Sequence, residues 1–283
     1  MLAPTIYQRE YELNEASFKL GTDTLVMGIV NVTPDSFSDG GKYQHVDAAL
    51  AHARQLVADG AHLLDIGGES TRPGHASVDE EEELKRVIPV IKAIHADMPH
   101  IPLSVDTYKA NVASQALEAG AHIINDVWGG LREPKILDVA AQFKCPIVLM
   151  HNRESRSYED YVPDVLQDLQ TLVESARAAG VSDQQIWLDP GIGFAKTGED
   201  NLELMHHLDD IVALGYPVLL GTSRKRFIRH VLDLPVDDVV EGTAATVALG
   251  IAQGCQIVRV HDVKAITRTV KMCDAMLKKV QRD

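Results

Sequence analysis

The sequence has 283 residues, and its 27 Lys and Arg against 41 Asp and Glu give a formal net charge of −14 at pH 7. This acidic balance argues against a nucleic-acid partner, because proteins bind phosphate backbones with basic surfaces. A content of 45% hydrophobic and 24% charged residues is typical of a soluble globular protein with one or two domains.

Neither a membrane partner nor a secretory signal is expected. The longest mostly apolar stretch, residues 243–255, is too short to cross a bilayer, and the first residues lack the apolar region of a signal peptide. Cys145, Cys255 and Cys273 lie far apart and form neither a disulfide framework nor a zinc motif. We therefore expect a reducing, cytoplasmic location.

Residues 1–23 precede the regular pattern and are expected to form an N-terminal extension, a hairpin or strap at the base of the fold. From residue 24 to residue 283, short runs rich in Val, Ile and Leu alternate with longer segments of helical period. The short runs do not alternate apolar with polar residues, so both faces should be buried, as in a parallel sheet covered by helices. The predicted strands are residues 24–31, 62–67, 101–106, 122–125, 146–151, 185–189, 217–221 and 256–261.

The segments between these runs place apolar residues on one stripe at helical spacing. In the second segment, Ser77 and Glu80 have capping-box spacing, and we interpret the acidic run 80–83 as a solvated helix face. The predicted helices are residues 46–59, 77–97, 109–119, 133–143, 163–179, 202–214, 238–253 and 262–280. Left-handed helix caps are expected at the glycines that follow several of them, namely Gly60, Gly120, Gly180, Gly215 and Gly254.

Eight strand–helix units predict an α/β protein with a (β/α)8 TIM barrel formed by residues 24–283. The alternative is an open doubly wound sheet. Its usual dinucleotide-binding mark, GxGxxG after the first strand, is missing from this sequence. The barrel is therefore the favoured interpretation.

Polar residues follow the predicted strands at their carboxyl ends, where barrel enzymes carry their active sites. Single polar residues often merely end a strand. Asp65 and Glu69 are interpreted as acceptors that brace a loop, with a role as ligands as the alternative. Carboxylates and carboxamides at three strand ends, with cations at two more, instead favour one shared polar ligand. The residues at these five strand ends are Asp106, Asn125, Asp126, Asp189, Lys225, Arg226, Arg259 and His261. Asn31, His151 and Asn152 end two further strands, and His151 is interpreted either as a hydrogen-bonded residue of the mouth or as a substrate contact.

The sign of these charges suggests what the ligand is. Cations gathered at one opening of a chain with charge −14 would suit a phosphate-like group, whereas Asp106 and Asp189 would accept neighbouring N–H donors of a flat heterocycle. The pattern thus predicts a ligand with a heteroaromatic head and a phosphorylated end. The long loops that contain Phe37 and Thr71 are interpreted as lids.

Nine segments of the chain resemble the dihydropteroate synthase family, in family order and at barrel-like spacing. They are MGIVNVTPDSFSDGG, DIGGESTRPG, SVDTYKA, INDV, LMH, LDPGIGFAKT, GTSRK, EGTAA and IVRVHDV. The resemblance implies a (β/α)8 enzyme that joins 6-hydroxymethyl-7,8-dihydropterin diphosphate to p-aminobenzoate. The products would be 7,8-dihydropteroate and diphosphate. It also implies a need for Mg²⁺, a homodimer, and a site of the kind that sulfonamide drugs target by mimicking p-aminobenzoate.

The same resemblance assigns site residues. Those matching the pterin pocket are Asp106, Asn125, Met150, Asp189, Phe194, Lys225 and Arg259, and Gly221 is added as a substrate-binding position. Those matching the diphosphate and metal site are Asn31, Arg72, Arg259 and His261, with Asn31 as the Mg²⁺ ligand. Those matching the surroundings of p-aminobenzoate are Phe37, Thr71, Pro73 and Lys225.

Four of these residues are expected to act in catalysis: Asp106, Lys225, Arg259 and His261. Departure of diphosphate would leave a cation delocalised into the pterin ring, which the carboxylate of Asp106 can stabilise in a water-poor site. Arg259, His261 and Mg²⁺ would stabilise the departing anion. The expected route is therefore a dissociative substitution.

Two positions depart from the family pattern. Arg226 follows Lys225 where the family commonly has Ser, so Arg226 either pairs with the aminobenzoate carboxylate or points outward. Trp128 stands where a small hydroxylated residue is frequent. The alternative functions are pterin-dependent methyl transfer to a corrinoid protein, and a pterin-binding module without catalysis.

Overall fold

The computed structural model describes residues 4–32, 42–69 and 78–277. Its chain begins with an antiparallel hairpin of β1 (Arg9–Leu13) and β2 (Ala16–Leu20), in which Arg9 pairs with Leu20. Asn14 takes a positive φ of 55° in the turn between them, a conformation that Asn tolerates well. The hairpin expected in the N-terminal extension is thus present. The boundary between extension and barrel at residue 24 stays a prediction.

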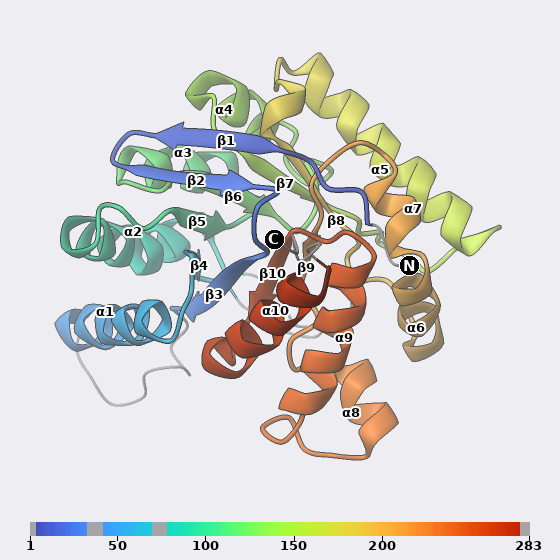
Figure 1. Ribbon diagram of the computed structural model, residues 1–283. Coiled ribbons are helices and arrows are strands. Elements are labelled where there is room, and N and C mark those ends of the chain that lie inside the picture. The colour runs from blue at the N-terminus through green and yellow to red at the C-terminus, as the bar shows by residue number, and fades with distance from the viewer. Residues whose placement is uncertain (1–3, 33–41, 70–77, 278–283) are drawn as a thin grey trace, which may run out of the picture.

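Eight parallel strands form the central sheet, in the spatial order β8-β7-β6-β5-β4-β3-β10-β9. A parallel bridge between Leu188 and Val218 joins the two ends of this order, and the N–H of Leu188 donates to the carbonyl of Pro217 at 2.9 Å. The sheet is therefore closed, and the predicted (β/α)8 barrel is confirmed (Figure 1). Its strands are β3 (Leu25–Asn31), β4 (Leu63–Gly67), β5 (Leu103–Asp106), β6 (Ile123–Asp126), β7 (Ile147–Met150), β8 (Ile186–Asp189), β9 (Leu219–Leu220) and β10 (Ile257–Val260).

Helices surround the barrel, as Figure 1 shows. They are α1 (Lys42–Ala58), α2 (Glu80–Asp97), α3 (Ala110–Glu118), α4 (Lys135–Phe143), α5 (Tyr161–Ala178), α6 (Gly198–His206), α7 (Leu208–Val212), α8 (Arg226–Leu232), α9 (Val240–Ala252) and α10 (Val263–Leu277), with a 3-10 turn at Asp183–Gln185. Among the described residues, no helix is both long enough and apolar enough to cross a membrane.

Several helix predictions were wrong in detail. α1 begins at Lys42 rather than Val46, and α8 was not among the predicted helices. The segment 202–214 forms two helices, α6 and α7, because the chain breaks at His207. The second predicted helix begins at Glu80 rather than Ser77, since Asp79 is its N-cap and accepts a hydrogen bond from the N–H of Glu82 at 2.8 Å. The glycine caps are confirmed, because all five glycines have φ between 92° and 112°.

The hairpin closes the barrel at the end where its strands begin. Alternate residues of β3 face opposite sides, so that Met27 belongs to an inner cluster while Val26 packs under the outer helices. In the inner cluster the indole N–H of Trp187 donates to the hydroxyl of Tyr11 at 2.7 Å, and that hydroxyl donates to the carbonyl of Gln184. With the starting end blocked, the opposite end of the strands is left for a ligand.

Candidate active site

Arg259 connects an aspartate on β4 to an aspartate on β5 at the mouth of the barrel. From β10 its Nε donates to Oδ2 of Asp65 at 2.6 Å, and its Nη2 donates to Oδ2 of Asp106 at 2.7 Å. Asn125, on β6, donates from Nδ2 to the same oxygen of Asp65 at 3.0 Å. Residues from four strands, separated by up to 194 positions in the sequence, therefore form one buried polar network.

Asp106 is the carboxylate in this network with the strongest change in proton affinity. Burial raises the pKa of Asp106 to about 7, although the positive charge of Arg259 acts in the opposite direction. Asp65 and Asp106 each have one buried oxygen, Oδ1, without a hydrogen-bond partner among the described residues. An unsatisfied buried acceptor is costly, so these oxygens favour a ligand that brings N–H donors.

Asp189 ends β8 and lies on the same mouth. Its Oδ1 accepts a hydrogen bond from the N–H of Gly191 at 2.7 Å, and burial raises its pKa. A Cβ added at Gly221 would lie 3.9 Å from Oδ2 of Asp189 and 4.0 Å from Cβ of Arg259. Gly221 therefore separates the two side chains, and its missing side chain leaves space between them. Met150 lies beside Asp189 in the sheet register.

Lys225 faces Asp189 from the start of α8. Its ammonium donates to the carbonyl of Ile192 and lies 4.7 Å from the ring centre of Phe194, in a cation–π contact. Burial lowers the pKa of Lys225 to about 8, while the negative charge of Asp189 opposes this change. Lys225 is thus a cation whose proton is easily lost, held between a carboxylate and an aromatic ring.

His261 and Asn31 lie at neighbouring strand ends. The backbone N–H of His261 donates to Oγ of Ser223 at 3.1 Å, and its Nδ1 lies 3.0 Å from the same hydroxyl. Asn31 ends β3 and pairs in register with Gly67, which in turn pairs with Asp106. Both residues are half-buried, so both can meet a ligand at the mouth.

Four predicted site residues, Phe37, Thr71, Arg72 and Pro73, lie outside the described residues, so the lid prediction stays untested. The other predicted site residues all lie at the same end of the barrel. Arg226, whose orientation was left open, is exposed on the first turn of α8.

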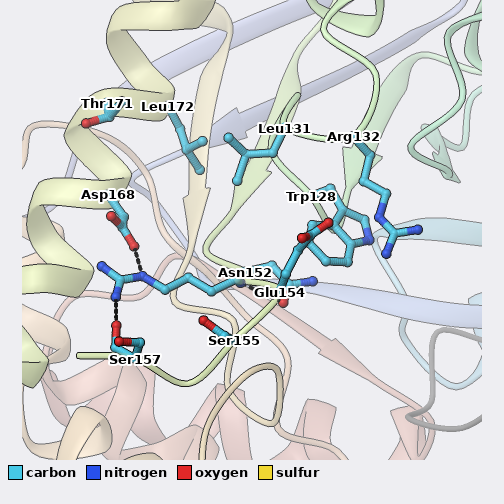
Figure 2. Close-up of a pocket in the computed structure, with 11 residues that line it drawn as sticks. Trp128, Leu131, Arg132, Asn152, Glu154, Ser155, Ser157, Asp168, Thr171 and Leu172 are labelled. Carbon is cyan, nitrogen blue, oxygen red and sulfur yellow. Dashed lines mark hydrogen bonds and ion pairs between the residues drawn. The ribbon is translucent and has the colours of Figure 1, made fainter.

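A separate groove of about 800 Å³ lies beside this mouth, on the loops after β6 and β7 (Figure 2). Trp128, the second departure from the family pattern, lies in it beneath the guanidinium of Arg132, at 4.2 Å from the ring centre. The residues that line the groove are Trp128, Leu131, Arg132, Asn152, Arg153, Glu154, Ser155, Ser157, Asp168, Thr171 and Leu172.

Comparisons with known proteins agree with this geometry. A family model described as pterin binding enzyme matches residues 27–261. Dihydropteroate synthase of Bacillus subtilis (strain 168) is 62% identical over 256 residues, which make up 90% of this chain and 90% of that protein. The chain belongs to the dihydropteroate synthase family. It is therefore a transferase of folate biosynthesis, as the motifs predicted.

Solved structures of the family have the same fold. The dihydropteroate synthase from Clostridium difficile in the presence of pteroic acid is 46% identical, with a TM-score of 0.89, and the match covers 92% of this chain and 98% of that one. The enzyme from Xanthomonas albilineans with 4-aminobenzoic acid is 43% identical, with a TM-score of 0.90 and a coverage of 95% and 98%. The alternative of corrinoid methyl transfer finds no support in these relatives.

The interpretation of the acidic run 80–83 as solvated was wrong for one residue. Glu83 is 1% exposed and pairs with the ammonium of Lys109, which also donates to Glu69 at 2.6 Å. Burial opposes a raised pKa at Lys109, but the hydrogen bonds that its ammonium donates to both carboxylates outweigh this effect and raise the pKa of the group. Glu69 has the bracing role expected of it, through Lys109. Asp65 instead holds two strand residues of the mouth, Arg259 and Asn125.

Sequence reasoning also missed Lys196 and left His151 undecided. The two side chains form a buried hydrogen bond of 2.7 Å between Nζ and Nδ1. A lysine inside the LDPGIGFAKT segment, directly after a strand end, was the signal that could have indicated a buried partner there.

Proposed function

We propose that the barrel mouth binds 6-hydroxymethyl-7,8-dihydropterin diphosphate and transfers its pterin methylene group to p-aminobenzoate, giving 7,8-dihydropteroate and diphosphate. The observation that carries this assignment is the placement of Asp106, Asn125 and Asp189 around a single arginine, Arg259. This arrangement offers acceptors for a heterocycle and a cation for its charged tail within one buried site.

The head of the ligand would bind among the carboxylates. Oδ1 of Asp106 is buried and lacks a partner among the described residues, so a ring N–H can donate to it. Asp189 and Asn125 would complete the polar edge, and the ammonium of Lys225 would donate to a ring oxygen or nitrogen. Met150 and Phe194 would cover the apolar faces, because both line the carboxyl ends of β7 and β8.

The diphosphate would lie towards Arg259, His261 and Asn31. Arg259 presents a guanidinium that is already held by two carboxylates, so its orientation is set before the ligand arrives. His261 is held in place by the hydroxyl of Ser223, which accepts a hydrogen bond from the backbone N–H of His261. A fixed cation stabilises charge that develops on a leaving group better than a mobile one does.

Mg²⁺ suits the oxygen donor found at the end of β3. Asn31 offers a half-buried amide oxygen there, and residues 4–32, 42–69 and 78–277 contain no cluster of three or more His, Cys, Asp or Glu that could hold a metal ion alone. Mg²⁺ commonly takes few protein ligands and uses phosphate oxygens and water for the rest. When bound, it would neutralise charge on the diphosphate, while Asn31 would orient it.

The chain's own residues favour a dissociative route. Once the carbon–oxygen bond to diphosphate breaks, the ionised carboxylate of Asp106 stabilises the positive charge spread over the pterin ring. Arg259 and His261 stabilise the departing anion. The amine of p-aminobenzoate then attacks the methylene carbon, and its extra proton leaves to solvent.

Rapid-quench measurement of diphosphate release tests this route. In the absence of p-aminobenzoate, the wild-type enzyme should release up to one equivalent of diphosphate per site, and Asp106→Asn should slow this release at least tenfold. Strict dependence of diphosphate release on p-aminobenzoate, in the wild-type enzyme, would refute the stepwise route.

A homodimer is part of the proposal. Large exposed apolar residues gather on α8, on the segment after it and on α9, which lie side by side in Figure 1. They are Val231, Leu232, Leu234, Val236 and Leu249. Such a patch favours a protein interface. Light scattering should give the mass of a dimer, and Leu249→Glu should give a monomer; a monomeric wild-type protein would contradict the proposal.

We also propose a cytoplasmic location. Cys145, Cys255 and Cys273 are all free thiols and all buried, which agrees with a reducing compartment.

A further inference from the structure

A chain of four side chains leads from the pterin site to the groove of Figure 2. It begins at Lys196, in the loop after β8, which is only 8% exposed. Nζ of Lys196, whose pKa is lowered to about 7 by burial, donates to Nδ1 of His151 at 2.7 Å and to the carbonyl of Phe194 at 3.1 Å. Lys196 therefore joins the end of β7 to the loop that carries Phe194.

His151 connects Lys196 to Asp168 on α5. Its Nε2 lies 3.0 Å from Oδ2 of Asp168, and the same oxygen accepts a hydrogen bond from Nε of Arg153 at 2.6 Å. Figure 2 shows Asp168 on the wall of the groove, with a dashed line at the hydrogen bond that its carboxylate accepts. The four residues, Lys196, His151, Asp168 and Arg153, are called the Lys196 chain below.

The donors and acceptors fix the tautomer of His151. Burial lowers the pKa of His151 to about 4, so the fully buried ring is neutral at pH 7. Arg153 and His151 hold the pKa of Asp168 at about 2 against the effect of burial, so its carboxylate is ionised and can only accept. Nε2 must therefore carry the hydrogen, and Nδ1 is left as the acceptor for Lys196.

The loop after β8 is shaped around this chain. Gly191 has a φ of +66°, and a Cβ there would lie 1.9 Å from the carbonyl oxygen of His151 and 3.3 Å from Nζ of Lys196. Ala195, a residue with a side chain, also takes a positive φ of 47°. The backbone can hold these conformations only because surrounding contacts determine them, and Lys196 supplies two of those contacts.

The same loop holds Lys225 in place. The carbonyl of Ile192 accepts a hydrogen bond from the ammonium of Lys225, and the ring of Phe194 lies against that ammonium. A shift of the loop would therefore move a cation and an aromatic ring of the site together.

We propose that Lys196, oriented through His151 and Asp168, is a positioning residue of the transferase, which fixes the loop after β8 and thereby Lys225 and Phe194. The inference rests on the proposed function, because the affected step is pterin binding at this mouth. Lys196 acts through other residues and is not itself a catalytic residue.

Asp168→Leu gives the sharpest test, because it keeps the approximate size of the side chain and removes the oxygen that accepts from Nε2 of His151. Asp168→Asn is the conservative variant, because its amide oxygen can still accept from both Arg153 and His151. Asp168 is 33% exposed and lies on the groove wall, so we expect both variants to fold. Lys196→Met removes the hydrogen bond to His151 directly, Lys196→Arg restores a donor, and Lys135→Met at an exposed position of α4 is the control.

Two measurements are needed. Titration calorimetry with 6-hydroxymethyl-7,8-dihydropterin diphosphate should show about tenfold weaker binding for Asp168→Leu and Lys196→Met. Asp168→Asn and Lys196→Arg should bind within threefold of wild type, and Lys135→Met should match it. Nitrogen NMR of the ligand-free protein should show a neutral His151 protonated on Nε2 in the wild type and in Asp168→Asn.

Unchanged pterin affinity in folded Asp168→Leu would overturn the proposal, and so would a wild-type His151 protonated on Nδ1. If Lys196→Met fails to fold, Asp168→Leu alone decides. Failure of the proposed function is separate from these outcomes, since the wild-type protein would then not bind the pterin diphosphate at all, whereas the tautomer is measured without ligand.

Discussion

Arg259 contributes to stability as well as to the site, because it forms ion pairs with Asp65 and Asp106. Removing one partner of a buried ion pair leaves an uncompensated charge. Arg259→Met should therefore lower the free energy of unfolding by about 3–5 kcal/mol. Urea denaturation measures this loss, and Arg259→Met combined with Asp65→Asn should recover part of it. A double variant less stable than Arg259→Met would contradict the role given to Asp65.

The pH dependence of the reaction follows from Asp106 and Lys225. Asp106 has a pKa of about 7, so its carboxylate loses its negative charge below pH 7. Lys225 has a pKa of about 8, so its ammonium loses its positive charge above pH 8. The kcat/KM for the pterin diphosphate should be highest between these values and fall on both sides. In Lys225→Arg the alkaline fall should disappear from the pH profile. Its persistence there would assign that limb to another group.

Some site residues could be identified from the sequence, whereas their long-range contacts could not. Asn125, Asp189 and Arg259 were identifiable, because each lies in or at the end of a run of strand character and belongs to a family motif. The contacts of Lys196 were not, since they depend on how α5 packs beside β7 and brings Asp168 to His151. Glu83 was misread for the same reason, because helical spacing alone does not show that Lys109 approaches it.

At the scale of elements, the loop after β8 depends on glycine at one position. Gly191→Ala would place a side chain at a φ of +66° and against the carbonyl of His151. Backbone strain of this kind costs about 1–3 kcal/mol, before the clash is counted. Gly198→Ala is the matched control, since nothing lies within 4 Å of its added Cβ and α6 begins there. Thermal melting that ranks Gly191→Ala equal to Gly198→Ala would contradict this account of the loop.

The hairpin of β1 and β2 should contribute stability without affecting chemistry. Tyr11→Phe removes the acceptor of the fully buried Trp187 N–H, at an expected loss of about 1–3 kcal/mol in the free energy of unfolding. Tyr11→Phe combined with Trp187→Phe should lose less than the two single variants together, because both polar groups are then absent. Guanidinium denaturation measures these changes, while kcat should stay at the wild-type value. A fall in kcat for folded Tyr11→Phe would mean that this end of the barrel reaches the active site.

Most elements could be predicted because their signals are local. Runs such as residues 146–151 have two buried faces and predict strands, and a glycine such as Gly120 marks the end of a helix. The break at His207 was missed, since the apolar period continues through it. The hairpin's fit against Trp187 depends on contacts between residues 176 positions apart, which no local pattern contains.

For the whole molecule, the notable feature is where charge lies in a chain with a net charge of −14. Lys225, Arg259 and His261 come from separate units of the barrel, and closure of the sheet brings them to one mouth. An anionic ligand can bind there in spite of the overall charge, because short-range pairing outweighs screened repulsion from the distant surface. The closed fold, more than any single segment, therefore creates the site.

Binding of 6-hydroxymethyl-7,8-dihydropterin diphosphate to Asp189→Asn tests this central claim most directly, with Asp209→Asn on α7 as the matched control. Calorimetry should show affinity reduced by about 1–3 kcal/mol in Asp189→Asn, because a ring N–H loses its charged acceptor, and wild-type affinity in the control. Wild-type affinity in Asp189→Asn would show that the pterin binds elsewhere.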